Sequence, residues 1–487
     1  WAEPPQVIER MVYRADGRGY LPNGHRHIFV LPAEGGTPRQ VTSGTYDHNG
    51  TPSWTPDGKH LVFSANREED RDLDPLDSEL YQVDLETGAI RELTDRQGPD
   101  NDPQVSPDGR WIAYLGFDDR LQGYQVTRLH LFDRQTRETR VLTGDLDRGV
   151  GSPRWSPDGR AVYVLYDDRG NTKLARVGLD GQVTVVTGGV GGTSLGRPYA
   201  SGDYAVGPDG RYAVTLTTPE RPADLAVGTL QRGGTGEPRR VTALNEDLLA
   251  HRELARVEEI VYESSHDGRQ IQGWIAYPPG FEAGSETKYP LLLEIHGGPF
   301  ANYGDRFAAE IQLYAAAGYV VLYTNPRGST SYGEEFGNLI HHAYPGFDYD
   351  DLMSGVDAVV ARGYVDPERL YVTGGSGGGV LTAWIVGKTD RFRAAAVQKP
   401  VINWTSFVFT ADLPGFFYKY WFPGLPWEHP EQYIERSPLF LAGNVETPTL
   451  IITGVMSKPV PSPSMYGMIG WSGTLSEKSA LTVIFCP

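Results

Sequence analysis

The sequence has few sulfur-containing side chains and a deficit of basic ones. Among its 487 residues there are one Cys and five Met, and 44 Lys and Arg stand against 62 Asp and Glu, for a formal net charge of −18. One Cys cannot form an intrachain disulfide or supply a Cys-based zinc site. Phosphate recognition needs clustered Lys and Arg, and the chain has no such run. We therefore expect no disulfide framework, no nucleic-acid partner and a cytoplasmic location.

The sequence also lacks any apolar run close to the roughly 18 residues of a membrane helix. It starts at Trp1 instead of Met, and its first residues show no signal-peptide pattern. We therefore expect no membrane partner, and we expect the chain to begin inside a longer protein. At about 150 residues per domain, the length predicts two or three domains.

Four similar turn motifs recur through the first half of the chain at spacings of 50 or 51 residues. They begin at Thr55, Ser106, Ser156 and Gly207, and each continues with Pro-Asp-Gly. Pro presets a turn and Asp-Gly tolerates its positive φ, so each motif predicts the tip of a hairpin between two short strands. A further strand pair follows each tip, and four strands per period of about 40–50 residues are typical of a β-propeller blade.

A weaker fifth unit precedes these four, so residues 1–253 are predicted to form a β-propeller with about five recognisable blades. Five units form either a complete ring or part of a larger one, and the repeats leave both open. A β-sandwich with similar turns is the alternative fold. The propeller alone predicts no activity, because propellers serve unrelated functions.

From residue 254 to residue 487 the pattern changes to that of an α/β domain. Apolar runs of strand length alternate with helical patterns. The predicted strands cover 289–295, 319–323, 370–373 and 450–453, and the predicted helices cover 307–317 and 348–362. Continuous apolar strands separated by helices indicate a mostly parallel sheet covered on both faces.

One turn in this domain carries the sharpest chemical signal. The strand ending at Thr373 runs into Gly374-Gly375-Ser376-Gly377-Gly378, and a helical pattern follows. This is the G-x-S-x-G nucleophile elbow in its strand–turn–helix context, where small residues allow a sharp turn that exposes the serine hydroxyl. Ser376 is therefore the predicted nucleophile, and a flexible Gly-rich linker is the alternative.

A second Gly-rich turn, His296-Gly297-Gly298-Pro299, directly follows the predicted strand 289–295. In α/β-hydrolases a turn at this place presents a backbone N–H that forms an oxyanion hole together with the N–H after the nucleophile. The predicted oxyanion donors are therefore the amides of Gly298 and Gly377. An ordinary strand-end turn is the alternative.

A β-propeller followed by such a hydrolase domain resembles the prolyl oligopeptidase family of serine peptidases, in its acylaminoacyl-peptidase-like and dipeptidyl-aminopeptidase-like branch. The residues that carry the resemblance are 293–299, 325–329, 350–357 and 374–379. The resemblance implies hydrolysis of short peptides through an acyl-enzyme on Ser376, without a cofactor, behind a propeller of about seven blades that restricts entry. It also suggests that the aromatic segment from Phe407 to Trp421 lines the substrate pocket, with core packing as the alternative.

The sequence departs from the family where the catalytic acid and base should follow the nucleophile. Only His429 follows Ser376 among the histidines, and it precedes the predicted strand 450–453, as do Asp390 and Asp412. Ser457 stands where the family has its catalytic Asp. We therefore expect the chain to be truncated or divergent after about residue 454. We also expect very low turnover, because losing a triad member lowers kcat on the order of 10⁴-fold.

Two other function classes stay open. One is a non-catalytic peptide-binding protein, and the other is an α/β-hydrolase esterase. The histidine pairs 25/27 and 341/342 lack the supporting carboxylates of a metal site, so we expect no metal. The sequence identifies no substrate-binding residues, leaves a homo-oligomer open, and does not separate exopeptidase from endopeptidase action.

Overall fold

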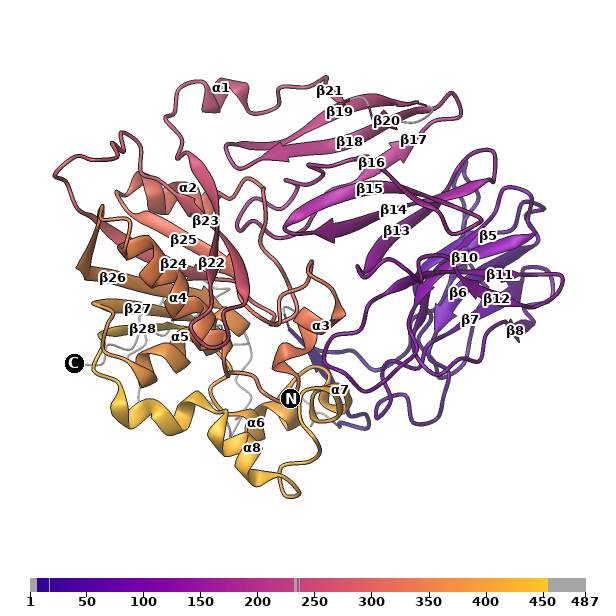
Figure 1. Ribbon diagram of the computed structural model, residues 1–487. Coiled ribbons are helices and arrows are strands. Elements are labelled where there is room, and N and C mark those ends of the chain that lie inside the picture. The colour runs from indigo at the N-terminus through magenta and orange to yellow at the C-terminus, as the bar shows by residue number, and fades with distance from the viewer. Residues whose placement is uncertain (1–6, 17, 232–233, 236, 454–487) are drawn as a thin grey trace.

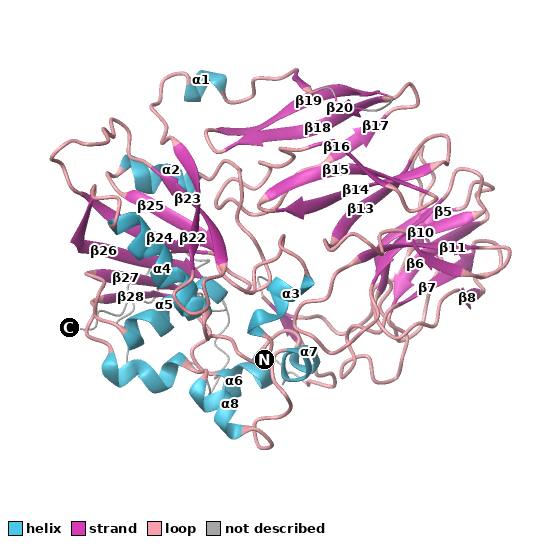
Figure 2. Cartoon of the chain, in the orientation of Figure 1, coloured by secondary structure: helices cyan, strands magenta, loops and turns pink. Residues whose placement is uncertain are grey.

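Two different kinds of β-structure make up the protein (Figure 1). The computed structural model describes residues 7–16, 18–231, 234–235 and 237–453. The first half is almost all antiparallel strands, and nearly all helices lie in the second half (Figure 2). The larger sheets of the first half follow one another in an arc beside the α/β part. This arrangement confirms the predicted fold class.

The sheets of the first half correspond to the predicted repeats. Three have four strands, one has five, and two strand pairs precede them. The strands of the larger sheets are β5 (Asn49–Trp54), β6 (His60–Ala65), β7 (Glu79–Asp84) and β8 (Ile90–Glu92); β9 (Asp100–Val105), β10 (Trp111–Gly116), β11 (Arg128–Asp133) and β12 (Thr139–Val141); β13 (Val150–Trp155), β14 (Ala161–Asp168), β15 (Asn171–Gly178) and β16 (Val183–Thr187); and β17 (Tyr204–Val206), β18 (Arg211–Thr218), β19 (Arg221–Gln231), β20 (Gly234–Thr235) and β21 (Arg239–Arg240). The pairs are β1 (Arg14–Ala15) with β2 (Gly19–Tyr20), and β3 (Phe29–Val30) with β4 (Arg39–Gln40).

The repeated turns join the first two strands of each larger sheet, as predicted. Their final glycines have φ between 67° and 76°. In the first three turns the leading Thr or Ser hydroxyl donates to the Asp two residues later, at 2.5–2.6 Å. The turn therefore needs a left-handed glycine and gains a local hydrogen bond, which explains why Ser/Thr-Pro-Asp-Gly recurs.

The second half is built on one seven-stranded sheet. Its order is β22-β23-β25-β24-β26-β27-β28, with β22 and β23 antiparallel at one edge and the other neighbours parallel. The strands are β22 (Val257–Glu263), β23 (Gln270–Ala276), β24 (Tyr289–Ile295), β25 (Val320–Asn325), β26 (Val365–Gly375), β27 (Ala394–Gln398) and β28 (Thr449–Ile452).

Helices cover both faces of this sheet. On one face, α4 (Asp348–Val360) and α5 (Gly377–Lys388) share a core with alternate residues of β24, β25 and β26. On the other face, α2 (Ala309–Ala316) packs against β23 and β25. The remaining helices are α1 (Glu246–Leu249), α3 (Glu334–Gly337), η1 (Asn338–Ile340), α6 (Trp404–Thr410), α7 (Pro414–Tyr420), α8 (Pro430–Glu435) and η2 (Pro438–Asn444).

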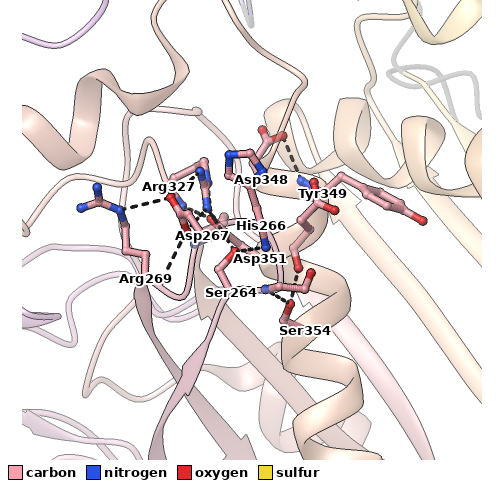
Figure 3. Close-up of polar contacts among 12 residues, drawn as sticks. Ser264, His266, Asp267, Arg269, Arg327, Asp348, Tyr349, Asp351 and Ser354 are labelled. Atoms are coloured by element: carbon pink, nitrogen blue, oxygen red, sulfur yellow. Dashed lines mark hydrogen bonds and ion pairs between the residues drawn. The ribbon is translucent and has the colours of Figure 1, made fainter.

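A buried ion pair joins two of the sequence motifs in this domain (Figure 3). Arg327 follows β25, and its guanidinium makes two hydrogen bonds to Asp351 of α4, at 2.8 and 2.9 Å. The Asp351 side chain is fully buried and that of Arg327 is 3% exposed. Asp267 and Ser264, from the β22–β23 turn, bind the same guanidinium at 3.1 Å. The pair thus fixes α4 against the antiparallel edge of the sheet.

We predict that Asp351→Ala lowers the free energy of unfolding by about 3–5 kcal/mol, because it leaves a buried guanidinium without its main partner. The control is Asp357→Ala on the same helix, whose partly exposed pair with Arg391 should contribute at most about 1 kcal/mol. Urea unfolding of both variants measures the difference. Equal losses in the two variants would contradict the structural role of Asp351.

Candidate active site

Ser376 is the single residue between the end of β26 and the start of α5. Its φ is 57° and its ψ is −117°, a left-handed conformation that costs energy in any residue other than glycine. Its amide donates to the Gln398 carbonyl at 2.9 Å, and its carbonyl accepts from the Val380 amide at 2.9 Å. The predicted nucleophile is therefore held in a strained turn by bonds on both sides.

The glycines around Ser376 are required by close contacts between backbones. A Cβ atom on Gly378 would lie 2.1 Å from the Ile295 carbonyl oxygen, and one on Gly377 would lie 2.7 Å from the Gly298 carbonyl oxygen. Any side chain there would push the strand-end turn away from the elbow. The run of glycines therefore reflects a packing requirement, not a flexible linker.

The turn after β24 lies directly against this elbow. A Cβ atom on Gly377 would lie 2.8 Å from the Gly298 nitrogen, and one on Gly297 would lie 3.4 Å from the Ser376 Cβ. In the described part of the chain, no acceptor faces the amide of Gly298 or that of Gly377. The structure thus brings together Ser376, Gly298 and Gly377, the three residues that the sequence singled out.

His296 fixes the direction of the turn from within the hydrolase domain. Its buried ring has Nδ1 at 2.7 Å from the Gly297 carbonyl oxygen and Nε2 at 2.9 Å from the Ser329 hydroxyl. A carbonyl only accepts, so Nδ1 carries the proton. In a trans peptide the carbonyl and the next N–H point in opposite directions. Holding the Gly297 carbonyl therefore directs the Gly298 N–H away from the imidazole.

Two residues of the propeller domain reach the same place. Arg197 and Tyr199 belong to the long connection between β16 and β17. The Tyr199 hydroxyl accepts a hydrogen bond from the Gly297 amide at 2.5 Å. A Cβ atom on Gly375, next to the nucleophile, would lie 2.5 Å from Nη1 of Arg197. The sequence predicted no role for these two residues, although a long irregular connection is itself a signal of function.

Arg197 joins two carboxylates where the domains meet. Its Nε lies 3.1 Å from Glu294 of β24 and 2.8 Å from Glu310 of α2, and its Nη2 donates to Gln398 at 3.2 Å. The Glu294 side chain is fully buried and also accepts from the Tyr303 hydroxyl at 2.9 Å. Burial raises the pKa of Glu294 to about 8, and Arg197 opposes that rise.

A small aromatic cavity, of about 10 Å³, lies beside the end of the turn that follows β24. Pro299, Phe300, Tyr344, Tyr420 and Trp421 are among its lining residues. The Tyr344 hydroxyl donates to the Gly377 carbonyl at 2.8 Å, so the cavity adjoins the elbow.

The aromatic segment from Phe407 to Trp421 therefore divides into two parts. Its end, Tyr420 and Trp421, reaches the cavity. Its start, Phe407, packs against Trp404 and Phe417 with ring centroids 5.4 and 4.5 Å apart.

None of the three described candidates for the rest of a triad, His429, Asp390 and Asp412, makes a hydrogen bond to Ser376. His429 lies at the start of α8, with Glu431 as its nearest carboxylate at 4.0 Å. In the described ranges no hydrogen bond is made by the Ser376 hydroxyl, and Asp390 and Asp412 stay unconnected to it. Ser457, which the sequence predicts at the position of the family's catalytic Asp, lies outside the described residues.

Two kinds of feature are absent from the described residues. No cluster of three or more His, Cys, Asp or Glu side chains there has a geometry suited to a metal ion. No helix in that part of the chain combines the length and apolarity needed to span a bilayer.

Comparison with known sequences gives matches across both halves of the chain. A profile of the prolyl oligopeptidase family matches residues 305–469, and a profile of the TolB β-propeller domain matches residues 20–193. The uncharacterized peptidase YuxL of Bacillus subtilis (strain 168) is 35% identical over 467 residues, which cover 92% of this chain and 68% of that protein. Dipeptidyl-peptidase 5 of Porphyromonas gingivalis is 27% identical over 415 residues, 82% of this chain.

Comparison with solved structures agrees on the fold. Acylaminoacyl peptidase of Pyrococcus horikoshii superimposes with a TM-score of 0.66 and 22% identity, over 88% of this chain and 75% of that one. The chain spans only 58% of the dipeptidyl-peptidase 5 sequence that it matches. The extent and identity of the match to the Bacillus protein, together with the two profiles, show that this chain belongs to the prolyl oligopeptidase family of serine peptidases.

Proposed function

We propose that the protein is a peptidase for short peptides, in which Ser376 forms an acyl-enzyme and the amides of Gly298 and Gly377 bind the oxyanion. The observation that carries this proposal is the strained Ser376 beside two amides that have no acceptor in the described part of the chain. Two preorganised N–H donors stabilise the negative charge that develops on the carbonyl oxygen.

The reaction has two halves. In acylation, the Ser376 oxygen bonds to the scissile carbonyl carbon, its proton passes to a base, and the amine leaves with a proton. In deacylation, water attacks the ester and the acid leaves. The described residues place no base beside Ser376. We therefore propose very low turnover for this chain, and the same observation supports non-catalytic peptide binding as the second candidate function.

We further propose that substrates are small. A second cavity, of about 420 Å³, lies between propeller residues such as Tyr124 and Tyr166 and the hydrolase residues Thr330 and Ser331. It supports access along the propeller, which suits short peptides better than folded proteins. The proposed domains are 1–253 and 254–487.

Ser376→Ala should abolish labelling by a fluorophosphonate probe. The unchanged chain should label on Ser376 over hours, without detectable peptide hydrolysis, because the described residues place the proposed oxyanion donors, but no base, beside Ser376. Ser43→Ala, at an exposed propeller position, is the matched control. Intact mass and peptide mapping measure labelling. Equal labelling of Ser376→Ala would remove the proposed nucleophile, whereas labelling within minutes together with peptide hydrolysis would refute low turnover.

Gly377→Ala should slow labelling of Ser376 by about 10²-fold or more, because the new Cβ would lie within 3 Å of the Gly298 backbone and displace an oxyanion donor. Gly443→Ala is the control, since a Cβ there would meet no atom within 4 Å. Second-order labelling rate constants provide the comparison. If the two alanine variants label equally fast, the oxyanion assignment is wrong.

The free energy of unfolding should rise with pH between about 4 and 6.5, in part because of His296. Burial lowers the pKa of His296 to about 4, so over this range the unfolded chain binds a proton that the folded chain does not. At about 1.36 kcal/mol per pKa unit, His296 contributes on the order of 3 kcal/mol to this dependence.

His296→Gln should therefore show a flatter dependence of unfolding free energy on pH than the unchanged chain. The exposed-site variant His251→Gln should keep the original slope. Urea unfolding at pH 4.5, 5.5, 6.5 and 7.5 supplies the four free energies. Parallel curves for all three proteins would show that His296 is not held neutral by burial.

A further inference from the structure

We propose that Tyr199, on the propeller, is a positioning residue for the turn 296–299 of the hydrolase domain, called the oxyanion turn because it carries the proposed donor Gly298. The inference rests on the proposed function, because it gives Tyr199 a role in the reactivity of Ser376. Its basis is the hydrogen bond from the Gly297 amide to the Tyr199 hydroxyl, made between residues 98 positions apart.

The oxyanion turn needs such support because of its own composition. Gly297 and Gly298 are consecutive, and Gly298 has φ of 132°, a value that side chains rarely allow. A Cβ on Gly297 would lie 2.9 Å from the Gly375 carbonyl oxygen, so the close approach to the elbow also demands glycine. Two adjacent glycines have the greatest backbone freedom of any dipeptide. The turn fits the elbow only because it has no side chains, and for that reason it has little preferred direction.

Two hydrogen bonds remove this freedom, one for each peptide unit. His296 donates to the Gly297 carbonyl and so sets the plane of the 297–298 peptide, whose N–H is the proposed oxyanion donor. Tyr199 accepts from the Gly297 N–H and so sets the preceding plane. The first support comes from the hydrolase domain and the second from the propeller. Both planes are therefore fixed only while the propeller segment is in place.

The propeller segment is itself firmly attached. The carbonyls of Leu195, Gly196 and Pro198 accept hydrogen bonds from the amides of Ala309, Glu310 and Gly304 at 2.7, 3.1 and 3.1 Å. The Tyr199 ring contacts that of Tyr303, with centroids 5.0 Å apart, and the two residues form a β-bridge. Arg197 adds the buried pair with Glu294. The Tyr199 hydroxyl is thus placed by a segment bound along its length to the hydrolase domain.

The test separates the hydroxyl from the ring. Tyr199→Phe keeps the ring contact with Tyr303 and removes the acceptor for the Gly297 amide. The control is Tyr319→Phe, which removes a phenolic hydroxyl just before β25. Tyr319 lies at the N-terminal end of its strand, whereas the elbow follows the C-terminal end of the parallel strand β26. Both variants are prepared in the full 487-residue chain. Their fluorophosphonate labelling rates, thermal unfolding midpoints and amide hydrogen exchange are measured.

We expect Tyr199→Phe to label on Ser376 at least 10-fold more slowly than the unchanged chain, with an unfolding midpoint within about 2 °C. Amide exchange in the peptide that contains Gly297 should be at least 10-fold faster, and exchange in the peptide that contains β25 should not change. Tyr319→Phe should match the unchanged chain in all three measurements. A merely structural role would lower the midpoint and leave the labelling rate of folded protein unchanged.

Two results would overturn the inference. One is labelling of Tyr199→Phe within 2-fold of the unchanged chain, and the other is unchanged exchange at Gly297. Failure of the proposed function looks different, since Ser376 would then resist the probe in the unchanged chain as well. In that case the exchange at Gly297 alone decides whether Tyr199 positions the turn, because that measurement needs no reaction at Ser376.

Discussion

The candidate site depends on a contact between two backbones with no side chain between them. The turn after β24 and the start of α5 approach so closely that a single Cβ on Gly378 would lie 2.1 Å from the Ile295 carbonyl oxygen. This approach places the amides of Gly298 and Gly377 side by side, and it leaves Ser376 as the one residue of the elbow with a side chain. The strain at Ser376 and the glycine runs on both segments therefore have one cause.

A turn made of glycines has little preferred backbone orientation of its own, so other residues must fix it. In this protein these residues come from both halves of the molecule. His296 comes from the same strand as the turn, whereas Tyr199 comes from a propeller connection that lies along residues 303–310. The propeller is therefore in direct contact with the candidate site. Through Tyr199 it holds part of the backbone that would bind the reacting carbonyl.

The sequence predicted what depends on local pattern. The strand 289–295, the turn at Ser376 and the two amides proposed as oxyanion donors could be placed because strand periodicity and glycine spacing are local properties. Arg327 and Asp351 belong to motifs noted from the sequence, but their pairing follows from how α4 packs on the sheet. Tyr199 and Arg197 could not be found this way, because a contact between a propeller loop and a strand about 100 residues later leaves no periodic signal.

The contacts of Arg197 with Glu294 and Glu310 also join the propeller segment to the hydrolase domain. A buried ion pair adds little net stability, because desolvation of both groups offsets their attraction, but removing one partner from it is strongly unfavourable. Separation of the propeller segment from β24 would remove from Glu294 the Arg197 guanidinium, which opposes the rise in the pKa of that carboxyl caused by burial. The segment that carries Tyr199 is therefore held by a contact between side chains as well as by backbone hydrogen bonds. The orientation of the Gly297 peptide depends on that attachment, since one short segment carries both the arginine and the tyrosine.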